Sequence, residues 1–209
     1  MPINLISVRN DIKRRYEDIK IMESILERNP KVDSQLILKS SLMLMIYNMV
    51  EGTMSNLLME YFDCIHTRNI TINSLSSEFQ RTIMPYFHKK ENHDDYKENH
   101  DDYIVDTVFD LSYSRIKKSL NLFSGNLDSR SIKKVCKKVG VNLTDDIKEP
   151  VLLIVKNNRN KLAHGETKFN NTCQDITLNE IEEISNKTQK YLIKVIDKYE
   201  ESLNTLYNM

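Results

Sequence analysis

The feature of this sequence that most constrains its fold is the scarcity of residues that interrupt helices. Its 209 residues include only four glycines and four prolines, whereas sheets with many tight turns need such residues at frequent intervals. Hydrophobic residues also recur at steps of three and four along extended stretches, which is the period of an amphipathic helix. We therefore expect an all-α protein built as a helical bundle.

The periodic stretches and their flanking residues predict about seven helices. The predicted helices cover residues 4–28, 33–66, 75–87, 104–123, 129–140, 145–164 and 178–207. The second is apolar on nearly all sides and should be the central core helix, capped by Asp33 or Ser34. Asp145 and Asp146 should occupy the first turn of the sixth helix. TLNE at residues 177–180 predicts a capping box for the last.

A perfect seven-residue repeat interrupts this pattern. KENHDDY occurs at residues 90–96 and again at residues 97–103. Its histidines and aspartates raise the question of a metal site, but no ligand spacing recurs outside the repeat. We interpret residues 90–103 as a tolerant acidic insertion in a single domain that spans residues 1–209. We expect neither a metal site nor a cofactor.

The charges of this chain sum to zero but are unevenly distributed. From Arg115 to Lys161 there are twelve basic and four acidic residues, a net charge of +8. Such a segment is expected of a polyanion-binding face, although a solvated helix surface would have the same composition. In its short basic helix, ending at Gly140, the predicted buried stripe is Ile132, Val135, Cys136 and Val139. This stripe leaves four lysines outside, namely Lys133, Lys134, Lys137 and Lys138.

The cysteines and the apolar segments indicate a cellular compartment. The three cysteines, at positions 64, 136 and 173, form neither a disulfide framework nor a zinc pattern, so we expect reduced thiols. The N-terminus lacks the apolar stretch of a signal peptide. The longest apolar region, residues 36–50, contains too many polar residues to span a membrane. We therefore expect a cytoplasmic protein that does not contact membranes.

The segment NNRNKLAHGE, residues 157–166, carries the residues best suited to chemistry. Arg159 falls on the apolar side of its helix, where a permanently charged guanidinium needs a partner. His164 lies about 140° around the helix from Arg159, so either the helix bends there or two copies of it meet. Asn160 shares the face of His164 and can orient its imidazole. A histidine that exchanges protons and an arginine that binds phosphate together suit metal-free phosphodiester cleavage.

RNKLAH resembles the R-x4–6-H signature of the HEPN superfamily. The segments YNMVEGTM, SGNLDSRSIKKV, RNKLAHGE and TLNE occur in the order of a stand-alone bacterial, MAE-type branch, from about residue 34 to the end. This resemblance implies a HEPN-like helical bundle with a four-helix core and a homodimer whose two motifs face each other. It also implies a metal-independent endoribonuclease of antiviral defence or of a toxin–antitoxin system.

The resemblance and the chemistry together suggest roles for individual residues. His164 would act as general acid or base at the attacking 2′-hydroxyl or the leaving 5′-oxygen, giving a 2′,3′-cyclic phosphate. Arg159 would stabilise charge on the phosphate, and Asn160 would fix His164. Glu51 lies among apolar residues, so its carboxylate needs a partner. We expect this partner to be Arg159 or His164, and the alternative is a Glu51 that pairs elsewhere or is partly exposed. RNA, with tRNA as one candidate, should contact five lysines, Lys133, Lys134, Lys137, Lys138 and Lys161.

Two other functions fit the same residues. The chain is alternatively a non-catalytic HEPN module that binds RNA or a partner protein, or a purely structural helical adaptor. RNA cleavage in EDTA that is lost in His164→Ala would distinguish the ribonuclease from both. HEPN toxins paired with a nucleotidyltransferase antitoxin carry a tyrosine two residues after the histidine, but this chain has Glu166 there. Control by modification of that residue is therefore not expected, whereas another antitoxin or defence protein is compatible.

Overall fold

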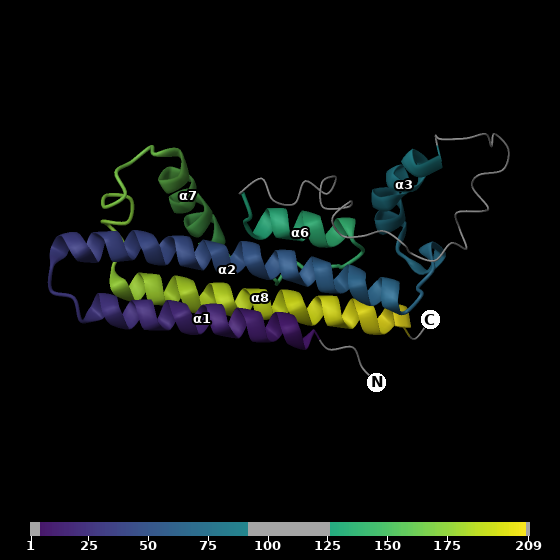
Figure 1. Cartoon of the computed structure of the whole chain (residues 1–209), viewed down its shortest axis with the longest axis horizontal. Coiled ribbons are helices and arrows are strands. Elements are labelled where there is room, and N and C mark those ends of the chain that lie inside the picture. The colour runs from purple at the N-terminus through teal and green to yellow at the C-terminus, as the bar shows by residue number, and fades with distance from the viewer. Residues whose placement is uncertain (1–4, 92–125, 208–209) are drawn as a thin grey trace.

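The computed structural model describes residues 5–91 and 126–207 (Figure 1). In these ranges it has six α-helices, one short 3-10 helix and no strand, which confirms the all-α prediction. The helices are α1 (Ile6–Glu27), α2 (Val32–Thr67), η1 (Ile72–Ser74), α3 (Ser77–Glu91), α6 (Ser129–Lys138), α7 (Val151–His164) and α8 (Leu178–Tyr207). The helix predicted at residues 104–123 and most of the acidic repeat lie outside the described residues.

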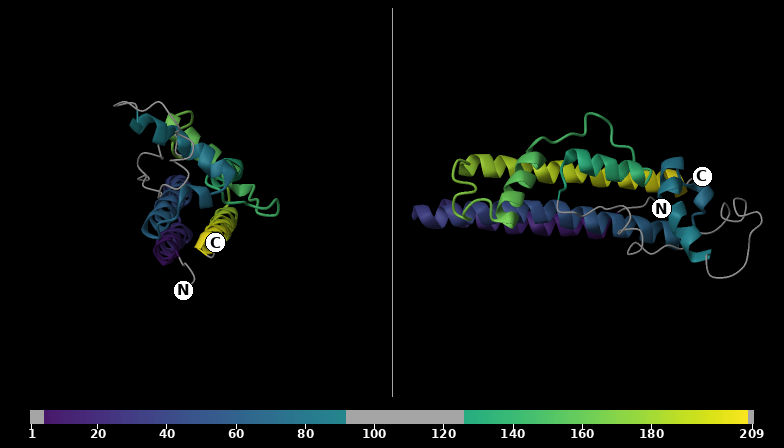
Figure 2. Two further views of the ribbon diagram at one scale, coloured as in Figure 1. Left: turned by 90° about the vertical axis from the view of Figure 1, so that its right-hand side faces the viewer. Right: turned by 90° about the horizontal axis from the view of Figure 1, so that it is seen from above.

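Three long helices form the body of the molecule. Helices α1, α2 and α8 run side by side, and each contacts the other two (Figures 1 and 2). The central stretch of the 36-residue α2 is buried on most sides. Met43, Ile46, Val50 and Leu57 on α2 are all fully inaccessible to solvent. Helix α2 is therefore the central core helix, as predicted, and we call α1, α2 and α8 the three-helix shaft.

Charged side chains inside the shaft pair with partners in the same chain. Arg9 of α1 donates to Glu200 of α8 from two nitrogens, with Nε–Oε1 at 3.0 Å and Nη2–Oε2 at 2.6 Å. Glu23 of α1 is 3% exposed and accepts hydrogen bonds from Lys20 Nζ and Ser185 Oγ, both at 2.6 Å. A buried carboxylate without such partners would be strongly destabilising. These contacts tie α1 to α8.

The helices α6 and α7 form a second layer on one side of the shaft, which we call the short-helix layer (Figure 1). Helix α7 contacts α2 and α8 and buries Leu152 and Val155, so it completes the predicted four-helix core. Helix α6 buries the predicted stripe of Ile132, Val135, Cys136 and Val139. Its four lysines lie on the outer side, with Lys133 half-exposed and the other three exposed.

Two predicted helix ends are confirmed by hydrogen bonds. At the start of α8, Thr177 and Glu180 form the capping box, with each side chain accepting from the backbone N–H of the other residue. After α6, Gly140 has φ of +78°, a left-handed conformation that glycine adopts without strain. The Val141 N–H then donates to the Cys136 carbonyl at 2.8 Å, the six-to-one bond of a Schellman motif.

The start of α2 differs from its prediction. The N-cap residue is Lys31, which makes no capping bond with its side chain, so neither Asp33 nor Ser34 caps the helix. Asn29 in the preceding turn holds the chain instead. Its side-chain oxygen accepts from the Lys31 N–H at 3.1 Å, and its carbonyl accepts from the Gln35 side chain at 2.6 Å. The turn out of α1 therefore sets where α2 begins.

The start of α7 also differs from its prediction. The helix begins at Val151, so Asp145 and Asp146 lie in the preceding loop and not in a first helical turn. Pro150 explains the difference, because a proline disfavours helical backbone in the residue before it. Proline itself is well tolerated where a helix begins. Pro150, and not the acidic pair, therefore marks the start of α7.

None of the described helices is long and apolar enough to cross a lipid bilayer. All three cysteines are free thiols, with Cys136 and Cys173 buried and Cys64 half-buried. Burial raises the pKa of the Cys136 thiol to about 12, so this group is held in its neutral form. The cysteines therefore act as hydrophobic core residues in this chain.

Candidate active site

The last residue of α7 is His164, and the backbone after it fixes this position. Gly165 has φ of +65°, and the next residue, Glu166, donates its N–H to the Lys161 carbonyl at 3.1 Å. A Cβ added at Gly165 would meet nothing within 4 Å, so the glycine is required for its backbone conformation and not for space. The chain reverses direction here and leaves the His164 side chain exposed.

Arg159 lies on the side of α7 that faces α2. The carbon at the centre of its guanidinium is 4.9 Å from the centroid of the Tyr47 ring, a separation typical of a cation–π contact. Its Nη1 also donates to the side-chain oxygen of Asn160 at 3.2 Å. The structure thus places Arg159 on the buried side of its helix and gives it partners, as the sequence predicted.

Tyr47 is a residue of this site that the sequence analysis did not assign. Its ring is fully buried, and its hydroxyl accepts a hydrogen bond from the Leu127 N–H at 3.3 Å. Burial raises the pKa of Tyr47 most, the charge of Glu51 raises it further, and Arg159 lowers it. A tyrosine in an apolar helix indicates such a role, because a buried hydroxyl needs a partner. Tyr47 joins α2, Arg159 and the chain entering α6.

Glu51 lies one helical turn after Tyr47 on α2 and is half-buried. Its carboxylate is close enough to influence the Tyr47 hydroxyl, as is Arg159. In the described part of the chain, however, Glu51 forms neither an ion pair with Arg159 nor a hydrogen bond with His164. The structure places Glu51 beside the Arg159–Tyr47 contact, and the role of holding the site remains a prediction.

Asn160 connects the two short helices. Its side-chain nitrogen donates to Asn126 Oδ1 at 2.7 Å, and its oxygen accepts from Arg159. The predicted contact with His164 is not among the hydrogen bonds of the described residues, although the two share a side of α7. The segment before α6 holds the amide of Asn160, and sequence spacing along α7 gave no information about that segment.

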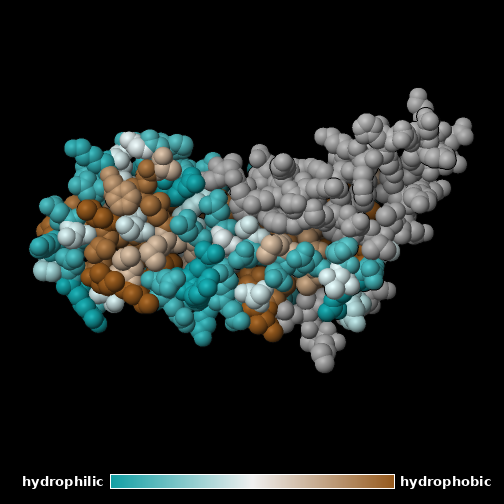
Figure 3. Space-filling view, in the orientation of Figure 1, coloured by the Kyte–Doolittle hydropathy of each residue, from teal (hydrophilic) through white to brown (hydrophobic). Residues whose placement is uncertain are grey.

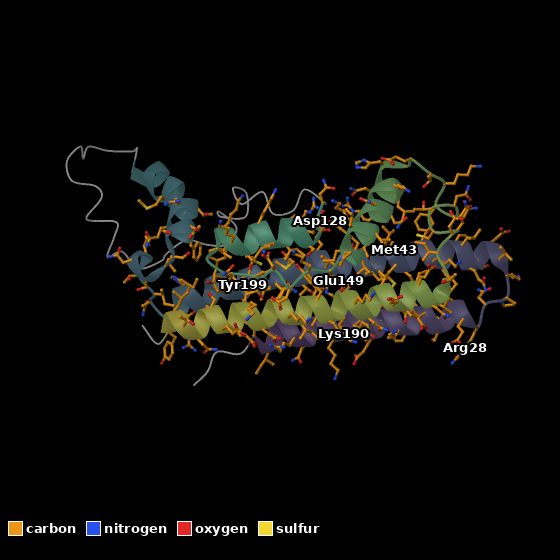
Figure 4. All side chains as sticks on the ribbon, turned by 180° about the vertical axis from the view of Figure 1, so that it is seen from behind. Arg28, Met43, Asp128, Glu149, Lys190 and Tyr199 are labelled. Carbon is orange, nitrogen blue, oxygen red and sulfur yellow. The ribbon has the colours of Figure 1, made fainter. Side chains whose placement is uncertain are left out.

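A second polar contact holds α6 against α7. Asp128 accepts a hydrogen bond from Lys156 at 2.5 Å and forms a capping box with Ser131 at the start of α6. Burial alone would raise the pKa of Asp128, but the hydrogen bonds from Lys156 and Ser131 lower it to about 2. Figure 4 labels Asp128 at the junction of the two helices. The basic helix is therefore fixed relative to the helix that carries Arg159 and His164.

The exposed side of α7 carries two hydrophobic residues near its start, about three turns before His164. Leu153, Asn157 and His164 lie within about 40° of one another around the helix, and all three are exposed. Leu153 is 49% exposed and Ile154, also on α7, is 44% exposed. Figure 3 shows hydrophobic surface gathered over the end of the molecule where α7 crosses α2. Exposed hydrophobic groups of this extent often mark an interaction surface.

The comparisons with known proteins identify one family. A family model described as HEPN_MAE_28990-like HEPN matches residues 6–206, which is nearly the whole chain. The match confirms the resemblance inferred from the RNKLAH motif and its flanking segments. No curated protein and no solved structure matches the sequence significantly.

Proposed function

The chain belongs to the MAE_28990-like HEPN family, and on that premise we propose that it is a metal-independent endoribonuclease that acts as a homodimer. The observation that carries this proposal is the placement of the two motif residues on one uninterrupted helix. Arg159 is held against the Tyr47 ring, whereas His164 is exposed at the end of α7. The pair supplies a fixed cation and an accessible proton-transfer group.

The proposed reaction is an attack of the ribose 2′-oxygen on the adjacent phosphorus. His164 accepts the proton of the 2′-hydroxyl as the new P–O bond forms, and the P–O bond to the 5′-oxygen breaks. The leaving 5′-oxygen takes a proton from an imidazolium, for which His164 of the second copy is available in a dimer. Arg159 stabilises the charge that grows on the non-bridging oxygens. The products are a 2′,3′-cyclic phosphate and a 5′-hydroxyl.

The proposal includes a second copy because Arg159 and His164 of one copy point to different sides of α7. Helix α7 runs without interruption from Val151 to His164, and five residues of helix rotate the side chains apart by about 140°. Two α7 helices facing each other would bring His164 of one copy toward Arg159 of the other. The exposed Ile154 would be covered in the same interface. We propose an interface built on α7 and α2.

RNA binding away from the cleaved phosphate is assigned to the exposed lysines. Lys134, Lys137 and Lys138 project from the outer side of α6, and Lys161 projects from α7. Lys133 lies beside them and is bonded to Asp145 Oδ1 at 2.6 Å, which compensates part of its charge. Lysine contacts to phosphate do not depend on base identity. We therefore propose that these lysines bind the RNA backbone and do not recognise its sequence.

The proposed function is tested by cleavage of total tRNA in EDTA. We expect the wild-type protein to cut it and leave 2′,3′-cyclic phosphate ends, and His164→Ala to lose cleavage while still binding RNA. The matched control is His66→Ala, which removes the exposed histidine in the last turn of α2 and should cleave normally. Binding without cleavage by the wild-type protein would instead support a non-catalytic HEPN module.

The same proposal places the protein in the cytoplasm, in antiviral defence or in a toxin–antitoxin system. An uncontrolled ribonuclease is toxic to its own cell, so a partner protein that restrains it is part of this proposal. Expression of the wild-type chain alone should arrest growth, and expression of His164→Ala should not. Equal growth of both strains at matched protein levels would contradict a toxin role.

A further inference from the structure

A hollow of about 350 Å³ lies between α8 and the loop before α7, away from the motif residues. Four of its eight lining residues are lysines, namely Lys148, Lys187, Lys190 and Lys194. Lys187, Lys190 and Lys194 follow one another at steps of three and four, so they share one face of α8. Lys190 is labelled on α8 below Glu149 of the loop in Figure 4.

A second hollow, of about 410 Å³, continues the first toward α6 and α7. The two hollows share three wall residues, Ile147, Lys148 and Glu149. The second hollow is also lined by Arg130 of α6 and Leu153 of α7. Together they form a groove from the lysine face of α8, across Lys148, to the start of α7. We call this the α8–α7 groove.

Several cations of the groove are not neutralised by carboxylates. Among the described residues, Arg130, Lys148, Lys190 and Lys194 form no ion pair within 4 Å, whereas Lys187 binds Glu183. The wall has two acidic residues, Asp128 and Glu149, fewer than its cations. Asp128 is bonded to Lys156, and a Glu149 side-chain oxygen accepts from the Val151 N–H at 3.4 Å. The groove is therefore a region of net positive charge.

We propose that the α8–α7 groove binds the phosphate backbone of a single RNA strand, with Lys148, Lys190 and Lys194 as its phosphate contacts. This inference rests on the proposed ribonuclease function and adds a path by which the strand reaches α7. RNA is favoured over a compact anion because the cations extend along a groove. Lys190 and Lys194 are about 6 Å apart along the helix axis, a spacing suited to successive phosphates of an extended strand.

The loop aspartates modulate this surface. Asp145 binds Lys133, and the Lys133 contact together with the charge of Lys148 lowers the pKa of Asp145. Asp146 carries its negative charge close to Lys194. These carboxylates occupy positions that strand phosphates would otherwise approach. Their neutralisation should therefore strengthen RNA binding, the opposite of the effect of neutralising the lysines.

The test measures RNA affinity in proteins that also carry His164→Ala, so that the probe is not cut. The probe is a fluorescein-labelled single-stranded RNA of mixed sequence. The variant is K148Q/K190Q/K194Q. The control is K13Q/R14Q/K31Q, which removes the same number of positive charges from exposed positions on α1 and the following turn. Binding is measured by anisotropy across a range of salt concentrations.

The groove variant should bind the RNA at least about tenfold more weakly than the parent protein. The slope of log K plotted against log salt concentration should also become smaller in magnitude by about 2, because each phosphate contact on a single strand contributes about 0.7. The control should keep both values. The D145N/D146N variant should bind a few-fold more tightly. An unchanged slope in the groove variant, or an equal fall in the control, would overturn the proposal. So would a groove variant that keeps its RNA affinity but loses binding to phosphatidylserine vesicles.

The outcome separates this inference from the proposed function. If His164→Ala abolishes cleavage but the groove variant binds RNA normally, the ribonuclease stands and the groove assignment is wrong. If the groove variant loses RNA affinity but the wild-type protein does not cleave, the groove stands in a protein that only binds RNA. If the protein binds no RNA, with or without the His164→Ala substitution, the groove assignment is wrong.

Discussion

The three-helix shaft and the short-helix layer each contain a half-buried arginine, and their surroundings differ. Arg9 in the shaft donates to Glu200 through two nitrogens and also contacts Asp197 at 2.6 Å. Arg159 in the short-helix layer contacts the Tyr47 ring and the amide oxygen of Asn160. Both carboxylates that bind Arg9 belong to α8, so the charge of Arg9 is used to join two helices. The ring and the amide beside Arg159 orient its guanidinium, and both belong to the candidate site.

The two regions are also held together differently. Buried apolar side chains pack the shaft along its whole length, so individual polar contacts there add to an extensive core. Helix α6 has ten residues and buries its own apolar stripe. Asn126–Asn160 and Asp128–Lys156 join its start to α7, and the Leu127–Tyr47 hydrogen bond joins it to α2. The comparison teaches that one apolar core runs through both regions, whereas the polar contacts of the short-helix layer also orient the residues of the candidate site.

The largest expected effect comes from replacing each of the two arginines by alanine in turn. Arg159→Ala should lower RNA cleavage by about 10²–10³-fold, the usual cost of removing a group that stabilises transition-state charge. Arg9→Ala should leave cleavage unchanged and lower the free energy of unfolding by about 1–2 kcal/mol. Single-turnover cleavage and urea denaturation of both variants provide the measurement. Equal losses of cleavage in the two would remove the distinction between the regions.

The next effect is a loss of stability at the buried carboxylate of the shaft. Glu23→Ala should lower the free energy of unfolding by about 3 kcal/mol, because it leaves Lys20 and Ser185 without their partner and opens a cavity. The control is Glu17→Ala on the same helix, where the side chain is 59% exposed. A Glu23 variant as stable as the Glu17 variant in urea would show that this contact does not tie α1 to α8.

At the α6–α7 junction we expect a smaller loss of stability, and we expect the stability contributed by Asp128 to depend on pH. The pKa of Asp128 is about 2 in the folded protein, below its ordinary value of about 3.9 in an unfolded chain. The depressed pKa contributes stability that is present above about pH 4 and is lost as the pH falls toward 2. Asp128→Asn should lower the free energy of unfolding at pH 7 by about 1–2 kcal/mol.

The measurement at Asp128 is urea denaturation between pH 7 and pH 2. The difference between the wild-type protein and Asp128→Asn should shrink across the acidic part of this range. Asp18→Asn, at an exposed position of α1, is the matched control and should follow the wild-type curve. A difference between wild type and Asp128→Asn that stays constant down to pH 2 would contradict the assigned ion pair.

A substitution at Tyr47 can distinguish the role of its ring from the role of its hydroxyl. Tyr47→Phe removes the acceptor of the Leu127 N–H and should lower the free energy of unfolding by about 1 kcal/mol. Cleavage should change little, because the ring beneath Arg159 remains. Tyr61→Phe is the control in the shaft, where the lost hydroxyl contacts Val139 and Ser202. A large loss of cleavage in Tyr47→Phe would assign a chemical role to its hydroxyl.

The smallest effect is expected from the acidic repeat. Deletion of residues 97–103 removes one copy of KENHDDY and should leave both the unfolding curve and RNA cleavage near wild type, since tolerant segments accept such changes. Binding of a divalent metal by the wild-type protein that is weakened in the deletion variant would show that this interpretation of the repeat is wrong.

Several features could be predicted from the sequence because they depend on neighbours a few residues away. The buried stripe of α6, the left-handed Gly140 and the capping box at Thr177 all follow from local spacing, and the structure confirms them. The position of Arg159 on the buried side of its helix follows from periodicity alone. The predicted start of α7 was wrong although its signal, Pro150, is local.

The sequence by itself determined the helical class, the family and the two motif residues, because periodicity, breaker scarcity and ordered motifs are properties of short segments. Only the tertiary structure decided which groups surround those residues. Tyr47 lies 112 positions before Arg159 in the chain, and their contact exists because α7 packs across α2. The same holds for the α8–α7 groove, whose cations come from α6, a loop and α8. Contacts between distant segments arise from packing, which local spacing does not specify.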